Sequence, residues 1–144
     1  MINILIVGAG KGIGLETARL LAKENLYTIS RNATPELDEL KTQFFEMDVA
    51  KNDLSDLSLP EELHGLVFCP GSINLRPFNR LTEEDFLADF NQNFMGAVRI
   101  IQKALPSLKK SKSASIVLFS TVAAKVGMPF HTSIAASKGA IEGF

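Results

Sequence analysis

Residues 2–14 read Ile2-Asn3-Ile4-Leu5-Ile6-Val7-Gly8-Ala9-Gly10-Lys11-Gly12-Ile13-Gly14, an apolar run that ends in a cluster of glycines. The run before Gly8 is short, β-branched and apolar on both faces, which is typical of a central strand in a parallel sheet. Glycines at the turn let the backbone approach a pyrophosphate closely and let the following helix pack tightly on the strand. That helix points its N–H groups and its positive dipole end at the turn, so an anion is the natural ligand. The stretch predicts a strand, a phosphate-binding turn and a helix, with an ordinary tight turn as the alternative.

The spacing of these glycines distinguishes two kinds of dinucleotide-binding turn. Gly8, Gly12 and Gly14 give G-x-x-x-G-x-G, whereas the larger dehydrogenases have G-x-G-x-x-G, whose third glycine would fall at Ile13. The chain instead resembles the short-chain dehydrogenase/reductase family, whose turn reads T-G-x-x-x-G-I-G, with Val7 in place of the threonine. The resemblance implies an α/β fold, a Rossmann-type doubly wound parallel sheet with the strand order 3-2-1-4-5. The turn residues that would bind the dinucleotide are Gly8, Gly10, Lys11, Gly12, Ile13 and Gly14.

The composition is that of an ordinary globular chain. The 144 residues are 46% hydrophobic and 22% charged, which fits a single dinucleotide-binding domain over residues 1–144. The net charge is −1 with acids and bases interspersed, so we expect neither a nucleic acid nor a membrane surface as partner. Cys69 is the only cysteine and Met1 leads directly into a strand, so we expect no disulfide, no leader peptide and a cytoplasmic location.

The rest of the chain alternates between apolar strand-like runs and helical patterns. Further strands are predicted at 26–30, 43–47, 63–68 and 114–119. Helices are predicted at 13–25, 34–40, 52–57 and, from a capping box at Thr82 and Asp85, up to Pro106 and the lysine pair 109–110. The sequence stops within a helical pattern at Phe144, so we expect the domain to be truncated at its C-terminal side, without the sixth strand that would lie beside the fifth.

Two basic residues indicate which dinucleotide would bind. Arg31 follows the second predicted strand, at the point where NAD enzymes place an acid against the ribose 2′-hydroxyl, and no acid occurs at positions 30–32. Lys11 lies inside the glycine turn, so both cations would meet the 2′-phosphate of NADP. The same two basic positions mark NADP preference in the family that the chain resembles. The alternative is two solvated surface charges.

The resemblance assigns further cofactor contacts at the ends of the next strands. Asp48 and Val49 would meet the adenine ring, with Asp48 accepting from its exocyclic amine, although a turn or helix-capping aspartate is an equal alternative. Gly71 would let the backbone pass close to the cofactor ribose. The family pattern N-N-A-G at positions 68–71 retains only this glycine.

The resemblance also assigns a set of catalytic residues, and the sequence departs from the family pattern at one of these positions. Asn93, in a motif similar to N-x-x-G, would hold a water of the proton relay, or would simply be satisfied between helices. Lys138 would hold the ribose hydroxyls, and Thr121 would polarise a carbonyl. Four residues before Lys138, where relatives carry the proton-donating tyrosine, stands Ile134. A water, Ser133 or His131 would have to serve as acid and base.

Two functions remain open at this point. The first is an NADP-dependent oxidoreductase that transfers hydride between nicotinamide and a small-molecule alcohol or carbonyl substrate. The second is an NADP(H)-binding protein with impaired catalysis that acts as a sensor or assembly partner. No metal site is predicted. A stripe of Phe86, Phe90 and Phe94 belongs to the core or to a subunit interface, and we expect a homodimer or homotetramer.

Overall fold

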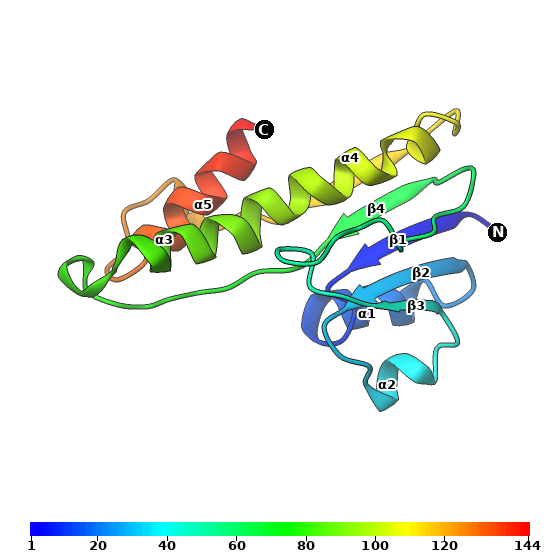
Figure 1. The fold of residues 1–144 in the computed structure, drawn as a ribbon, viewed down its shortest axis with the longest axis horizontal. Coiled ribbons are helices and arrows are strands. Elements are labelled where there is room, and N and C mark those ends of the chain that lie inside the picture. Colours follow the sequence, from blue (N-terminus) through cyan, green and yellow to red (C-terminus); the bar gives the residue numbers. More distant parts are fainter.

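A computed structural model describes residues 1–144, and its centre is a parallel five-stranded sheet in the order β3-β2-β1-β4-β5 (Figure 1). The strands are β1 (Asn3–Val7), β2 (Asn25–Ser30), β3 (Gln43–Glu46), β4 (Gly65–Phe68) and β5 (Ser115–Leu118). All four neighbouring pairs are parallel, so every strand ends at the same edge of the sheet. The predicted Rossmann-type fold class and strand order are therefore confirmed.

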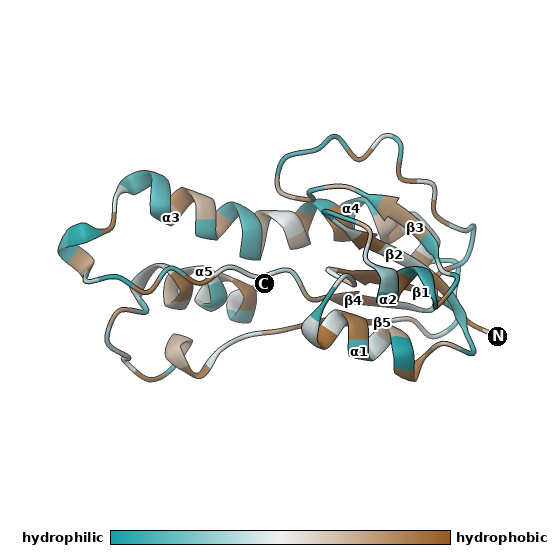
Figure 2. Cartoon of the chain, turned by 90° about the horizontal axis from the view of Figure 1, so that it is seen from below, coloured by the Kyte–Doolittle hydropathy of each residue, from teal (hydrophilic) through white to brown (hydrophobic).

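The helices cover both faces of the sheet and extend past its carboxyl edge. They are α1 (Gly12–Leu20), α2 (Pro35–Asp38), α3 (Glu83–Phe90), α4 (Gly96–Leu108) and α5 (Thr132–Gly143), with short 3₁₀ turns at Phe78–Arg80 and Val122–Ala124. A π-helical segment, Asn91–Met95, joins α3 to α4. Figures 1 and 2 show α1 on one side of the sheet and α4 on the other, while α3 and α5 lie together beyond the ends of the strands. No helix of the chain combines the length and the apolar character that crossing a bilayer requires.

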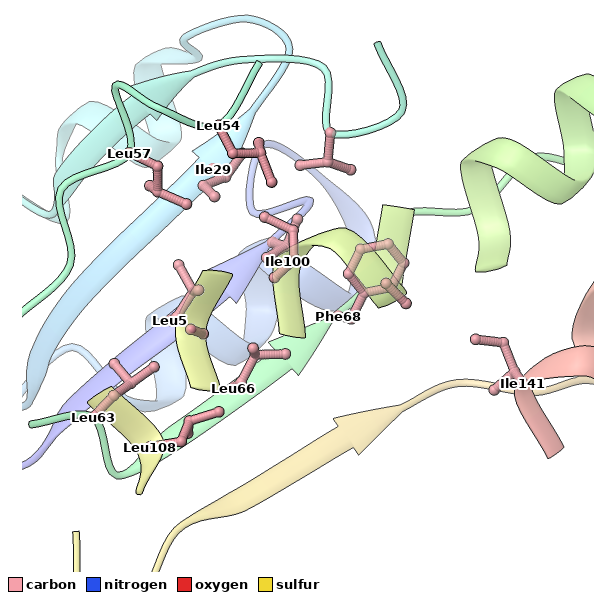
Figure 3. Close-up of a cluster of buried hydrophobic side chains, with 14 residues drawn as sticks. Leu5, Ile29, Leu54, Leu57, Leu63, Leu66, Phe68, Ile100, Leu108 and Ile141 are labelled. Carbon is pink, nitrogen blue, oxygen red and sulfur yellow. The ribbon is translucent and has the colours of Figure 1, made fainter. Parts of the chain in front are cut away.

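β1 divides the core into two layers because its side chains alternate between the faces. Leu5 and Val7 pack on the α4 side, whereas Ile4 and Ile6 pack on the α1 side. All four are buried, which explains why the run is apolar without alternation. Figure 3 shows the α4-side layer, where Ile100 and Leu108 lie over Leu5 and Leu66 while Ile141 of α5 stands apart at its rim.

The segment Asn52–Leu57 was expected to form a brief helix, and this prediction is wrong, because the residues form turns and bends. The carboxylate of Asp53 accepts hydrogen bonds from the N–H and hydroxyl of Ser55 at 3.1 and 2.9 Å. The guanidinium of Arg99 on α4 donates to the carbonyl oxygens of Val49 and Asn52. The Ser55 N–H and the Asn52 carbonyl therefore bond to side chains instead of to other main-chain groups of a helix.

The long helix begins as predicted and differs from the expected continuous pattern at two later points. At its start, Thr82 and Asp85 form the predicted capping box in full, with hydrogen bonds in both directions at 3.2 and 3.0 Å. Pro106, expected at the end of the helix, lies inside its last turn, and the helix ends at Leu108. The π segment inserts a wider turn at Asn93, whose side chain is buried.

Candidate active site

A cavity of about 380 Å³ opens at the carboxyl edge of the sheet, where β1, β2 and β4 end. This is the crevice in which open parallel sheets bind ligands. Its lining includes every residue that the sequence predicted to bind cofactor except Lys138: Gly8, Gly10, Lys11, Gly12, Ile13, Gly14, Arg31, Asp48, Val49 and Gly71. Residues that sequence reasoning did not assign also line it, among them Ser30, Asn32, Thr34, Met47 and Gln92.

The glycine turn brings the end of β1 and the start of α1 into direct backbone contact. Gly8 has a φ of +80°, a left-handed conformation that favours glycine. A Cβ at Gly14 would lie 2.2 Å from the carbonyl oxygen of Gly8, so α1 starts in direct contact with the turn. Lys11 precedes the first residue of α1 and makes no side-chain cap, which leaves the first N–H groups of the helix free to meet an anion.

Both predicted cations line this cavity. Lys11 and Arg31 are exposed, and neither pairs with any of the acidic side chains of the chain. Ser30, which ends β2, lies beneath Gly10 and its hydroxyl donates to the carbonyl of Asn32. The loop that carries Arg31 is thereby tied down next to the glycine turn. Asp48 accepts from the N–H of Ala50 at 3.0 Å, which is the turn geometry that the sequence left open.

A buried polar chain lies next to the cavity. The side-chain N–H₂ of Asn93 donates to Ser72 Oγ at 3.0 Å and to the main-chain carbonyl of Asp89 at 2.8 Å. Ser72 Oγ donates to one carboxylate oxygen of Asp89 at 2.5 Å, and Ser133 Oγ of α5 donates to the other at 2.6 Å. Asn93 Oδ1 is buried without a partner and faces Gly71 of the cavity, where a Cβ would lie 3.3 Å from it.

The remaining candidates, Thr121, His131 and Lys138, lie along the segment from β5 to α5 and, like Asn93, do not line the cavity. Lys138 is 8% exposed, and burial lowers its pKa, an effect that the neighbouring Cys69 opposes. The hydroxyl of Thr121 accepts from the N–H of Ala123 at 3.3 Å and so begins a 3₁₀ turn. The half-buried His131 has its Nδ1 2.7 Å from the carbonyl oxygen of Pro129.

The sequence profile described as short chain dehydrogenase matches residues 3–144. The chain belongs to the short-chain dehydrogenase family. The 3-ketodihydrosphingosine reductase of Bacteroides thetaiotaomicron is 25% identical to it over 98% of the chain and 55% of the relative. The 3-oxoacyl-[acyl-carrier-protein] reductase MabA of Mycobacterium avium is 30% identical over 98% of the chain and 57% of the relative. The chain therefore spans little more than half the length of these curated relatives.

A crystal structure shares the fold of this short-chain dehydrogenase chain. It is a short chain dehydrogenase of Shigella flexneri 2a complexed with NADP, with a TM-score of 0.88 and 23% identity. The alignment covers 99% of the chain and 68% of the crystal structure. The similarity establishes that the fold is the same over nearly all of the residues described above.

The structure also shows what sequence reasoning about this family member missed. Asp89 and Ser72 were not singled out, although Asp89 and Asn93 are one helical turn apart among the phenylalanines of an otherwise apolar stripe. An acid at such a position signals a buried polar partner. The only tyrosine, Tyr27, lies in β2, whereas Ile134 lies in the first turn of α5 and is 5% exposed.

Proposed function

We propose that the chain is the dinucleotide-binding domain, residues 1–144, of an NADP-dependent oxidoreductase that transfers hydride between nicotinamide and an alcohol or carbonyl substrate. The observation that carries the proposal is that Lys11 and Arg31, both without acidic partners, line the same cavity as the glycine turn. No acid follows Ser30 at the end of β2 to bind a ribose 2′-hydroxyl instead. The NADP complex of the Shigella flexneri relative supports the same choice of cofactor.

The glycine turn fits a pyrophosphate, because its four glycines line the cavity and the first N–H groups of α1 are uncapped. NADP, when bound, would supply the hydride chemistry, and the protein would supply position and electrostatics. Asp48, Val49 and Gly71 would line the adenine and ribose portions of the cavity.

The remaining roles follow the family resemblance. Lys138 would hold ribose hydroxyls, Asn93 would anchor a water, and Thr121 would donate to the substrate carbonyl. Ile134 cannot exchange a proton, which leaves the role of general acid and base to another group.

His131 is our candidate for that role. The carbonyl oxygen of Pro129 can only accept, so the 2.7 Å contact places a proton on Nδ1 of the imidazole. Nε2 of the neutral ring then keeps its lone pair and can take a proton from an alcohol or, once charged, return one to a carbonyl.

Titration of the protein with NADPH and with NADH, followed by cofactor fluorescence, tests the choice of cofactor. Charge-assisted contacts contribute roughly 1.5–3 kcal/mol each before solvent screening, so we expect at least about tenfold tighter binding of NADPH. Lys11→Ala and Arg31→Ala should each weaken NADPH binding and leave NADH binding unchanged. Lys23→Ala, which removes an exposed lysine outside the cavity, is the matched control. Tighter binding of NADH by the unaltered protein would contradict the assignment.

The second candidate function is NADP(H) binding without turnover, in a sensor or an assembly. The burial of Ile134 in the first turn of α5 favours it, because no proton donor stands at that position. Steady-state NADPH oxidation across a panel of small carbonyl compounds separates the two functions. Consumption that falls on His131→Ala supports the enzyme, whereas tight NADPH binding without consumption supports the sensor.

A further inference from the structure

Asp89 is a buried carboxylate for which the proposed reaction has no use. It lies in α3, is 4% exposed, and has no lysine, arginine or histidine as a partner. Burying an unpaired carboxylate destabilises the folded state unless hydrogen bonds offset the lost hydration. Its two hydroxyl donors compensate in part, but an apolar side chain of similar size would pack there at lower cost. The carboxylate is therefore poorly explained by stability alone.

The two hydroxyls that Asp89 holds come from two different segments of the site. Ser72 directly follows Gly71, which lines the cavity, and Ser133 lies in the first turn of α5, the helix that carries Lys138. Helix α3 packs directly against α5. The carboxylate thus joins the loop after β4 to α5 through hydrogen bonds of 2.5 and 2.6 Å.

The charge of Asp89 also sets the direction of the two hydrogen bonds that Ser72 makes in this polar chain. An ionised carboxylate only accepts, so the Ser72 hydroxyl must donate to it and can offer only a lone pair to Asn93. Asn93 directs its N–H₂ toward two acceptors, Ser72 and the main-chain carbonyl of Asp89, and its Oδ1 therefore faces Gly71. An amide at position 89 could donate to Ser72, and the Ser72 hydroxyl would then no longer be held as an acceptor for Asn93, whose N–H₂ would keep only its bond to the main-chain carbonyl of Asp89.

We propose that Asp89 is a positioning residue, whose carboxylate holds the Ser72 hydroxyl as an acceptor for the Asn93 amide and couples this wall of the cavity to α5. The wall lies at the end of β4, and Arg31 follows β2, so the two are on opposite sides of β1. Asp89 should therefore affect how the cavity binds the half of a dinucleotide that lies on the β4 side of β1, away from Lys11 and Arg31. This inference rests on the proposed NADP(H) binding.

The test compares NADPH with adenosine 2′,5′-bisphosphate, two ligands that share the phosphorylated adenosine portion. Adenosine 2′,5′-bisphosphate carries the phosphates that Lys11, Arg31 and the glycine turn would bind, but it lacks the nicotinamide half of NADPH. Asp89→Asn keeps the shape of the side chain and removes the charge. We expect this variant to bind NADPH roughly tenfold more weakly, the cost of about one charge-assisted hydrogen bond, and to keep its affinity for the bisphosphate.

Two matched controls separate this role from a general loss of stability. Glu83→Gln removes an exposed negative charge from the same helix. Ser133→Ala removes a hydroxyl bound to Asp89, whereas Ser137→Ala removes a buried hydroxyl of the same helix that donates only to the main-chain carbonyl of Ser133. The ratio of the NADPH and bisphosphate dissociation constants should rise in Asp89→Asn and Ser133→Ala and stay unchanged in Glu83→Gln and Ser137→Ala.

An unchanged ratio in Asp89→Asn, or an equal loss of both ligands, would overturn the positioning role. If Asp89→Asn does not fold, the Ser133→Ala and Ser137→Ala variants test the positioning role instead. The ratio of the two dissociation constants should rise only in Ser133→Ala, and equal ratios in the two variants would overturn the proposal. A wild-type protein that binds neither ligand would refute the proposed NADP(H) binding itself, which is a different outcome from an unchanged ratio.

Discussion

Whether the chain can transfer a proton during catalysis depends largely on the side chain at position 134, which is Ile134. A positioned general acid and base contributes roughly 10²–10⁴ in rate, which is about 3–5 kcal/mol of barrier. Ile134→Tyr would place a phenol one helical turn from Lys138, whose positive charge favours the phenolate and lowers the pKa of the phenol. We expect faster NADPH oxidation with small ketones at unchanged NADPH affinity, measured by steady-state kinetics.

The matched control for this substitution is Ile134→Phe, which adds the ring without the hydroxyl. Because Ile134 is 5% exposed, a ring of either kind must displace its neighbours to a similar extent. Equal rates in the two variants, or brisk wild-type turnover that survives His131→Ala, would show that another group transfers the proton.

Cys69 offers a second measurement at the scale of one side chain. Burial raises the pKa of the Cys69 thiol to about 11, and the nearby Lys138 opposes this rise. The thiolate is the reactive form, so alkylation by iodoacetamide should be slow at pH 8 and should accelerate about tenfold per pH unit as the pH approaches 11. Because Cys69 lines the cavity and is the only cysteine, NADPH should protect it.

The control for the thiol is the same protein in urea, where Cys69 should titrate near the usual value of about 8.5. Rapid alkylation of the folded protein at pH 8 would mean that Lys138 outweighs burial at this position.

At the scale of single elements, the start of α1 depends on a glycine with no space for a side chain. In Gly14→Ala the new Cβ would lie 2.2 Å from the Gly8 carbonyl oxygen, so the helix must move away from the turn. We expect a loss of about 1–3 kcal/mol in the free energy of unfolding, measured by urea denaturation, together with weaker NADPH binding.

Gly139→Ala in α5 is the matched substitution, because no atom lies within 4 Å of the added Cβ. Alanine is the better helix former by about 1 kcal/mol, so this variant should be as stable as the wild type or slightly more stable. Equal effects of the two substitutions would argue against the close contact between α1 and the turn.

The helices, strands and turns show which structural features could be predicted from the sequence. The glycine turn, the alternation of strands and helices, and the capping box at Thr82 depend on residues close in sequence, and these features were predicted from it. No helix forms at Asn52–Leu57, where Arg99, far along the chain, binds the carbonyl oxygen of Asn52. The π segment at Asn93 was not expected either, and no residue pattern in that stretch distinguishes it from an α-helix.

In the candidate site, too, some features could be predicted from the sequence, whereas those that depend on the packing of distant segments could not. The candidate cofactor-binding residues follow the strand ends, so their gathering at one edge could be predicted from topology alone. The polar chain could not, because Ser72, Asp89 and Ser133 meet only when α3 packs on α5.

For the molecule as a whole, the open question is self-association. The phenylalanine stripe is partly satisfied within the chain, since the Phe90 and Phe94 rings lie 5.0 Å apart and Phe94 lies 5.6 Å from Phe144. Leu87 on α3 and Leu105 on α4 stay 51% and 40% exposed. We propose that the long helix formed by α3 and α4 pairs between copies together with α5, as the family resemblance implies, and we expect light scattering to give the mass of a dimer or tetramer.

A charged side chain in that surface should reduce the measured mass. Leu105→Glu should shift the protein toward the monomer, whereas Leu20→Glu, on the 86% exposed Leu20 of α1, should leave it unchanged. A monomeric wild type at the concentrations used would contradict the proposal.

The central position of β1 has a consequence for how the nascent chain is made. Ile4 pairs with Leu26 on one side and with Gly65, 61 positions further along, on the other. At roughly 5–20 residues per second, a ribosome completes β4 about 3–12 s after β1. During those seconds one edge of an apolar strand has no neighbour to pair with, and the newborn polypeptide depends on the ribosome surface and on chaperones to keep it from joining another chain.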